Sequence, residues 1–276
     1  MLQGYFPPLS PSGKSGLVSA PPWHYAGDAL GIRFRADPDA AAATLPPGLA
    51  VDPDSPGGAT ALFMDWQFSS EDQTYLDPVS QYREFLLLVD ATWQGTPVSW
   101  CPYIYVDNDA SLARGWVQGF PKKMGTIHQT RSFPVATPAA PPLGPGGTFA
   151  AAASTHGVRI AEGRVTLAAP VADPAALVGR PLVNRRYFPR LAAGRHQEPA
   201  VDELVRADLH DLQVVNAWAG SAEFSLPDAP GNETSALAPI SVDAGFKATI
   251  TYSVQDLTTL VDLTTDLSTD RTTEPS

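Results

Sequence analysis

The sequence predicts a mainly β fold in which curled antiparallel sheets enclose the core and helices are few and short. About ten segments combine β-branched or aromatic residues with period-two alternation or short apolar runs, and clusters of proline, glycine, aspartate and serine separate them. Few segments show the helical period of 3.6 residues. This balance favours a barrel or a curled pair of sheets over a doubly wound α/β fold.

The expected elements follow in a simple order. Residues 1–22 are rich in proline and glycine, and we expect them to wrap over the surface. A strand begins near Ala29, where apolar and polar residues alternate, and a short helix follows with Asp37 as its N-cap and Pro38 at its first position. Further strands are expected at 59–68, 82–90, 97–107, 125–133, 148–155, 158–170, 211–220, 221–226 and 246–254.

The length suits one large domain or two small ones, and we expect a single β-barrel domain over residues 23–265. The polar stretch 266–276 is expected to be a disordered tail.

Composition excludes several classes of protein. With 43% apolar residues in 276, the chain can bury a large core, and a formal net charge of −11 opposes binding to nucleic acid. No apolar run of transmembrane length and no secretory signal is visible, so we expect a soluble, cytoplasmic protein that does not associate with membranes. Because Cys101 is the single cysteine and the histidines are scattered, we expect no metal and no cofactor.

One helix expected inside the β region presents polar side chains on a single face. It covers residues 108–118 and ends at Gly119. Arg114 and Gln118 lie four residues apart and share a face, and Lys122 follows four residues later, just beyond the break. A guanidinium, an amide and an amine therefore point towards one region.

Lys122 and Lys123 are adjacent in a chain that has only four lysines. A lysine amine is a nucleophile only when it is unprotonated, so its pKa must fall from about 10.4. Burial beside Trp116 and Phe120, together with the neighbouring ammonium of Lys123, would lower the pKa of Lys122. Such a lysine forms a Schiff base with a ketone. The alternative is a solvated turn with two surface lysines.

Three ordered motifs resemble the acetoacetate decarboxylase-like superfamily. They are YRE at 82–84, YIYVDND at 103–109 and GFPKKMG at 119–125. Fainter similarity extends over 23–256 and includes NAWAG at 216–220. The resemblance implies a cone-like, mainly β barrel that assembles into a homo-oligomer.

The resemblance also implies roles for three residues. Lys122 is the Schiff-base lysine, Lys123 lowers its pKa, as is known for acetoacetate decarboxylase, and Glu84 is the acid near the reacting carbon. For Glu84 the alternative is an exposed strand carboxylate paired with Arg83 or Arg131.

Two departures from the decarboxylase pattern concern the polar groups around the substrate. Decarboxylases carry Gly-Arg-Glu ahead of the lysine turn, where this chain has Arg114, Gly115 and Trp116. They also carry an arginine near the N-terminal strand, where this chain has AGDALG at 26–31. Arg114 and Gln118 instead resemble the branch that includes an enduracididine biosynthetic enzyme and pyruvate aldolase-dehydratases.

In that branch the arginine and the glutamine hold the carboxylate of a 2-oxo acid, which suits Arg114 and Gln118 because guanidinium pairs bidentately with carboxylate. Both could instead be surface residues of the helix. Tyr252 resembles the branch's proton donor, although a barrel tyrosine with a satisfied hydroxyl is an equal alternative. His24 could line the mouth of the pocket or be a packed surface imidazole. The remaining candidates for substrate binding are Tyr82, Trp116 and Phe120.

The sequence therefore predicts an aldolase-dehydratase whose partners are a small 2-oxo acid and an aldehyde. Lys122 forms the imine and then the enamine, and Glu84 and Tyr252 move protons. One alternative is decarboxylation of a 3-oxo acid through the same imine. Another is a non-catalytic barrel that binds a small apolar ligand.

Overall fold

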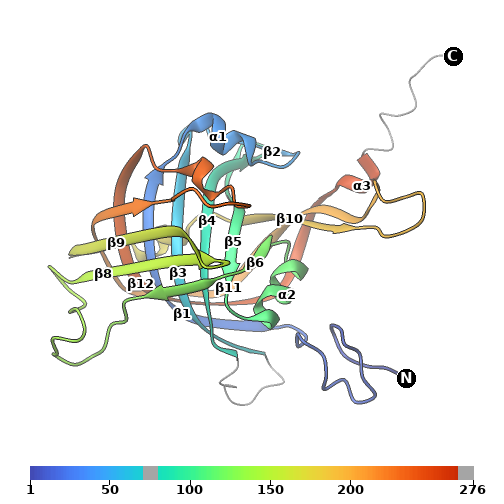
Figure 1. Ribbon diagram of the computed structural model, residues 1–276, viewed down its shortest axis with the longest axis horizontal. Helices are drawn as coiled ribbons and strands as arrows, with labels where there is room; N and C mark the ends of the chain where they lie inside the picture. The colour runs from blue at the N-terminus through green and yellow to red at the C-terminus, as the bar shows by residue number, and fades with distance from the viewer. Residues whose placement is uncertain (71–79, 267–276) are drawn as a thin grey trace.

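One strongly curled sheet dominates the structure (Figure 1). The computed structural model describes residues 1–70 and 80–266. The strands in this part of the chain are β1 (Trp23–Arg35), β2 (Leu49–Val51), β3 (Gly58–Ser70), β4 (Tyr82–Trp93), β5 (Thr96–Val106), β6 (Lys122–Met124), β7 (Thr126–Gln129), β8 (Thr148–Thr155), β9 (Val158–Pro170), β10 (Leu182–Pro189), β11 (Pro199–Ser225) and β12 (Ser241–Asp262). The helices are α1 (Pro38–Ala43), α2 (Asp109–Val117) and α3 (Leu263–Asp266), with 3-10 turns η2 (Pro174–Val178) and η3 (Thr234–Leu237).

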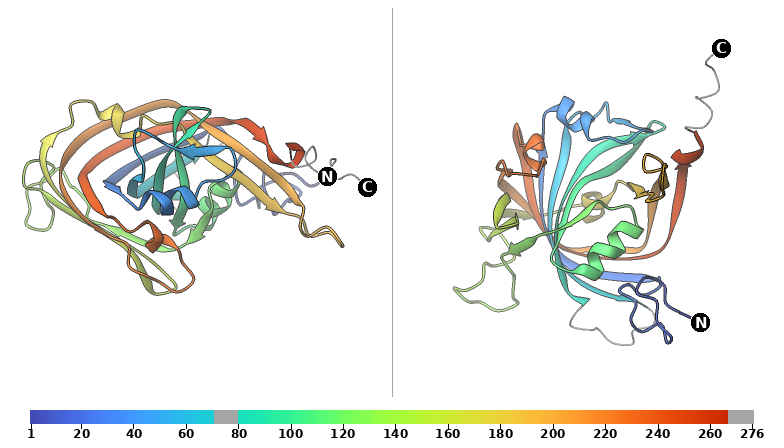
Figure 2. Two further views of the ribbon diagram at one scale, coloured as in Figure 1. Left: turned by 90° about the horizontal axis from the view of Figure 1, so that it is seen from above. Right: turned by 45° about the vertical axis from the view of Figure 1, so that its right-hand side comes forward.

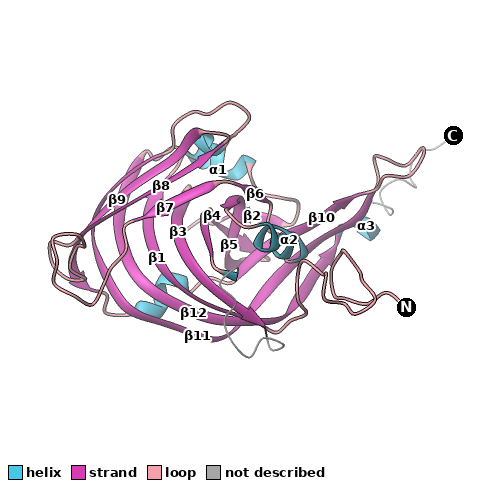
Figure 3. Cartoon of the chain, turned by 60° about the horizontal axis from the view of Figure 1, so that its bottom comes forward, coloured by secondary structure: helices cyan, strands magenta, loops and turns pink. Residues whose placement is uncertain are grey.

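The strand order is β10-β5-β4-β3-β1-β12-β11-β9-β8-β7, and β10 also pairs with β11. This second pairing bends the sheet back on itself, and the curl is visible from above and from below (Figures 2 and 3). Most pairings are antiparallel, and the parallel ones include β5 with β10 and β5 with β6. The predicted mainly β fold with curled antiparallel strands is confirmed, as a curled sheet and not a closed regular barrel.

The central strands bury side chains on both faces of the sheet. On β1, Leu30, Ile32 and Phe34 belong to one apolar core. Tyr25 and Ala29, which alternate with them, belong to a second core on the opposite face. The second core is the one that surrounds the candidate site.

The predicted helices formed as expected. Asp37 caps α1 by accepting hydrogen bonds from the backbone N–H groups of Asp39 and Ala40, with Pro38 at the first helical position. The first strand begins at Trp23, earlier than the predicted start near Ala29.

The largest difference concerns β11, which is one strand of 27 residues where two shorter strands were predicted. Asp211 and Asn216 have positive φ angles of 53° and lie at irregularities in its pairing with β12. Aspartate and asparagine tolerate this backbone region, and bulges bend a strand without ending it. Polar turn residues within 211–216 therefore mark bends of one long strand. β10 was not predicted, and the strand predicted at 125–133 is replaced by the short β6 and β7.

Within the described residues, no helix is both long and apolar enough to cross a membrane. The predicted disordered tail lies outside the described residues from position 267 onwards.

Candidate active site

Helix α2 and the turn that follows it set the direction of β6, the strand that contains Lys122 and Lys123. Asn108 caps the helix by accepting a hydrogen bond from the Ser111 N–H at 2.9 Å. At the other end Gly119 has a φ of +81°, and the Phe120 N–H donates to the Gly115 carbonyl at 2.9 Å. This is a Schellman turn, and it requires a left-handed residue that glycine supplies without strain. The chain then enters β6 beside β5.

The two adjacent lysines point in opposite directions because side chains alternate along β6. Lys122 is 6% exposed. Lys123 is exposed, and its Nζ lies 3.0 Å from Asn232 Oδ1 and 5.6 Å from the centre of the Tyr105 ring. Lys122 therefore reaches the interior alone.

The amine of Lys122 lies within a buried polar cluster. Its Nζ is 2.7 Å from Glu84 Oε2 and donates to Ser111 Oγ at 3.0 Å. The other carboxylate oxygen, Glu84 Oε1, accepts a hydrogen bond from Trp66 Nε1 at 3.2 Å. Glu84 thus contacts the amine and is held in place by a second group, and it does not pair with Arg83 or Arg131.

The pKa of Lys122 is lowered, first because burial disfavours the ammonium and then because the positive charge of Arg114 is close. Glu84 acts in the opposite direction and raises this pKa. The prediction assigned the lowering of this pKa to burial and to the adjacent ammonium of Lys123, and burial is the first cause. The cation that lowers this pKa is Arg114 on the interior side, because Lys123 points outward.

Arg114 is buried among aromatic rings, at 3% exposure. Its guanidinium carbon lies 3.6 Å from the centre of the Phe68 ring, 5.5 Å from that of Tyr25 and 5.6 Å from that of Tyr82. Among the described residues, no carboxylate forms an ion pair with it. Burying a cation without an anion is costly, so the arrangement favours a ligand that supplies a negative charge.

Gln118 is buried one helical turn beyond Arg114. Its Nε2 lies 3.5 Å from the Tyr25 hydroxyl and 3.4 Å from the Arg114 carbonyl. These are long hydrogen bonds, which leave the amide able to turn towards a ligand.

Tyr252 completes the cluster from β12. Its ring stacks on Tyr25 with 4.9 Å between the centroids and meets Trp66 edge-on at 5.6 Å. Burial raises its pKa well above the usual value, and the same holds for Tyr82. Both phenols therefore stay protonated and able to donate near neutral pH.

Some of these groups line a cavity of about 370 Å³, whereas Lys122 and Arg114 do not line it and lie next to the lining residues Glu84 and Gln118. At the end near Lys122 its lining includes Trp66, Glu84, Gln118, Phe120 and Tyr252. No group of three or more histidine, cysteine, aspartate or glutamate side chains that could hold a metal occurs in the part of the chain that the structure describes.

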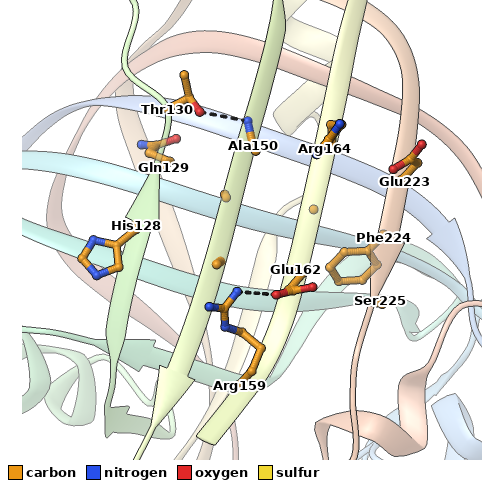
Figure 4. A pocket seen from close by; sticks show the side chains of 13 residues that line it. His128, Gln129, Thr130, Ala150, Arg159, Glu162, Arg164, Glu223, Phe224 and Ser225 are labelled. Carbon is orange, nitrogen blue, oxygen red and sulfur yellow. Dashed lines mark hydrogen bonds and ion pairs between the residues drawn. The ribbon is translucent and has the colours of Figure 1, made fainter. Parts of the chain in front are cut away.

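A larger hollow of about 750 Å³ lies elsewhere, on β7, β8, β9 and β11 (Figure 4). Its polar lining includes His128 and the exposed ion pair of Arg159 with Glu162. None of the predicted site residues lines it, so it is not the candidate active site.

Seven predicted site residues lie together in the structure: Lys122, Glu84, Arg114, Gln118, Tyr82, Phe120 and Tyr252. Three others do not join them. Lys123 points outward, and Trp116 is 44% exposed and uses its Nε1 to donate to the Lys122 carbonyl at 3.0 Å. His24 alternates with Tyr25 and contacts Ser253 Oγ at 2.8 Å through Nδ1, away from the cavity lining.

The prediction missed Ser111, Trp66, Tyr25 and Phe68. Ser111 lies three residues before Arg114, so the helical period that grouped Arg114 and Gln118 could also have found it. The three aromatic residues come from β1 and β3, and only the pairing of these strands places Tyr25 opposite Phe68.

The cavity beside the buried lysine has the size of a small-molecule site. The chain belongs to the acetoacetate decarboxylase family, whose pattern matches residues 6–263. An enduracididine biosynthesis enzyme, MppR, complexed with the condensation product of pyruvate and imidazole 4-carboxaldehyde, is 37% identical with a TM-score of 0.88, covering 95% of this chain and 98% of that chain.

Two further structures extend the comparison. The same enzyme complexed with pyruvate is 38% identical, with a TM-score of 0.86 and coverage of 95% and 99%. An acetoacetate decarboxylase-like enzyme from Sphingomonas wittichii RW1 is 29% identical, with a TM-score of 0.86 and coverage of 95% and 100%. No curated protein sequence matches the chain.

Proposed function

We propose that this protein condenses pyruvate or a similar 2-oxo acid with an aldehyde through a Schiff base on Lys122, and then eliminates water. The observation that carries the proposal is the pairing of a buried amine with a buried guanidinium around Tyr82. Lys122 Nζ lies 5.3 Å and the Arg114 guanidinium carbon 5.6 Å from the centre of that ring. A 2-oxo acid carries a ketone directly beside a carboxylate, which matches these two groups.

The first step is formation of the imine. The neutral amine of Lys122 attacks the ketone carbon of pyruvate, and the ketone oxygen leaves as water after it takes up protons. Glu84 lies within hydrogen-bond reach of the amine and can receive its proton and return it to the departing oxygen. Arg114 and Gln118 hold the carboxylate.

The second step produces the enamine. Glu84 removes a proton from the methyl carbon, and the electron pair of that C–H bond moves into the protonated imine. The nitrogen becomes neutral and the methyl carbon becomes nucleophilic.

The third step joins the two substrates. The enamine carbon attacks the aldehyde carbon, and the hydroxyl of Tyr252 donates a proton to the aldehyde oxygen. The proton that Glu84 took in the second step returns the Tyr252 phenolate to the phenol. Glu84 then removes a second proton from the former methyl carbon, and the hydroxyl takes up a proton from Tyr252 and leaves as water; Glu84 passes its proton back to Tyr252. Hydrolysis of the imine releases an unsaturated 2-oxo acid and restores the Lys122 amine.

Decarboxylation of a 3-oxo acid shares the imine but needs different polar groups. The sequence Arg114-Gly115-Trp116 lacks the acid of the decarboxylase motif. On β1, Gly27 and Gly31 face Trp66 and Phe246, so no β1 side chain extends into the site at these positions. These features support condensation, and so does the neighbouring enduracididine enzyme, which binds pyruvate and its condensation product.

The test combines trapping with product analysis. Borohydride treatment with pyruvate should add a permanent mass to Lys122, found by peptide mass mapping. The adduct should be lost in Lys122→Ala and Lys122→Arg and kept in Lys123→Ala, the adjacent control lysine. Absence of an adduct in the parent protein would leave a non-catalytic binding protein as the better interpretation.

A second measurement identifies the reaction. Pyruvate with an aldehyde should give a conjugated product that absorbs in the ultraviolet, whereas acetoacetate alone should release little carbon dioxide. Rapid release of carbon dioxide, with no conjugated product, would favour the decarboxylase.

A further inference from the structure

The cavity extends well beyond the cluster around Lys122. On β3 and β4 the residues that line it recur at every second position, from Trp66 to Thr60 and from Glu84 to Asp90. Met64 is paired with Glu84 and Leu62 with Leu86, so the two rows run side by side. Six residues of strand span about 20 Å, which makes the cavity an elongated groove, and Glu84, the carboxylate that contacts the Lys122 amine, lies at one end.

The walls of the groove between its ends are apolar. Leu62, Met64, Leu86 and Leu88 form the sheet side, and Leu182 and Ile250 are among the residues that face them from other strands. A volume of about 370 Å³ is in the range of small-molecule sites. It exceeds what pyruvate, bound at the Lys122 end, can fill.

The far end of the groove is polar but balanced in charge. Arg33 forms two hydrogen bonds with Asp90, one of them at 3.0 Å, and also donates to Thr60 Oγ1 at 3.2 Å. Arg180 pairs with Asp52 at 2.6 Å and lies 3.7 Å from Asp90. Two arginines and two aspartates therefore neutralise one another.

A charged group on a substrate would gain no ion pair at this end of the groove. Each arginine already has a carboxylate partner, and a charge moved along the apolar walls would lose its hydration without compensation. The contrast with Arg114 is clear, because Arg114 has no carboxylate partner among the described residues. The groove thus has one end at Gln118, next to the buried cation Arg114, and a long remainder suited to an uncharged apolar chain.

We infer that the second substrate is an uncharged aldehyde with an extended apolar chain, which lies along β3 and β4 with its carbonyl at Tyr252. This inference rests on the proposed condensation. The chain holds the aldehyde carbon next to the enamine, so burial of the tail contributes to the rate of the condensation step.

The test is a series of unbranched aldehydes, namely propanal, butanal, hexanal, octanal and decanal, each with saturating pyruvate. The value of kcat/KM for the aldehyde should rise by up to about fourfold for each added methylene until the groove is full. Succinic semialdehyde, which carries a carboxylate, should be used more slowly than hexanal. A flat series, or a preference for the charged aldehyde, would overturn the inference.

A substitution in the groove tests where the apolar chain of the aldehyde lies. Leu88 lies four residues beyond Glu84 on β4, about 13 Å along the strand. Leu88→Phe narrows the far half of the groove, so the ratio of decanal to butanal kcat/KM should fall by at least tenfold. Leu191→Phe makes the same change at a side chain that is 95% exposed, and the ratio should stay as in the parent. Equal ratios in the two variants would contradict the placement.

Borohydride trapping with pyruvate alone separates the two proposals. If no pyruvate adduct forms, the proposed function and this inference fail together. If the adduct forms at Lys122 and the aldehyde series is flat, only the inference about the tail fails.

Discussion

The side chain of Lys122 crosses helix α2 directly over Gly115, where a Cβ atom would overlap the lysine Cγ, Cδ and Cε atoms. Glycine inside a helix costs about 0.5–1 kcal/mol relative to alanine. Here the missing side chain is the space through which the lysine reaches Glu84. Gly115 therefore both weakens the helix and allows the amine of Lys122 to reach its position.

Gly115→Ala should strengthen the helix locally and displace Lys122. A misplacement of about 1 Å costs on the order of 100-fold in rate, so borohydride trapping with pyruvate should slow by about that factor. Gly144→Ala is the control, because a Cβ at Gly144 meets nothing within 4 Å. Parent-like trapping in Gly115→Ala would show that the lysine does not need this path.

The pH dependence of imine formation should follow the charges around Lys122. The unprotonated amine reacts, so the rate rises as the pH passes through the pKa of Lys122. Arg114 lowers this pKa and Glu84 raises it. Arg114→Met should therefore move the profile to higher pH and Glu84→Gln to lower pH, whereas Lys123→Ala should leave it unchanged.

Acetone with cyanoborohydride is the suitable probe for these profiles, because acetone has no carboxylate for Arg114 to bind. If the pH profile shifted as far in Lys123→Ala as in Arg114→Met, Lys123 would also be a charge that changes the pKa of Lys122.

The carboxylate-binding role proposed for Arg114 predicts a dependence on substrate. Arg114→Ala should weaken trapping of pyruvate relative to acetone by the value of a charge-assisted contact, about 1.5–3 kcal/mol, or roughly 10- to 150-fold. Gln118→Ala should have a smaller effect. Equal losses with pyruvate and acetone would mean that Arg114 only supports the fold.

Tyr252→Phe should separate imine formation from the later steps. The variant keeps the ring that stacks on Tyr25 and loses only the hydroxyl. Pyruvate trapping should persist, while formation of the conjugated product should fall by about 100- to 10,000-fold, the usual contribution of a general acid. Parent-like product formation would exclude the tyrosine as the proton donor.

Local periodicity explains which parts of the site were predictable. Arg114, Gln118 and Lys122 were grouped correctly because helical spacing depends only on neighbouring residues. Trp66 and Phe68 were missed because their place beside the helix residues follows from the pairing of β3 with β1 and β4, which no local pattern encodes.

The error about Lys123 has a related cause. Adjacent residues are close in sequence, but the short β6 turns their side chains to opposite faces. The single long β11 was likewise divided in the prediction, because the polar residues at its bends resemble turns between separate strands.

The buried guanidinium of Arg114, which has no carboxylate partner among the described residues, makes the free enzyme sensitive to the solution around it. A small carboxylate such as acetate or formate has the charge and shape to occupy the same position. If Arg114 holds the 2-oxo acid as proposed, buffers that contain these anions should act as competitive inhibitors, raising the apparent KM for the 2-oxo acid with their concentration while kcat stays constant. The apparent affinity for the 2-oxo acid should therefore depend on the buffer salt in which it is measured.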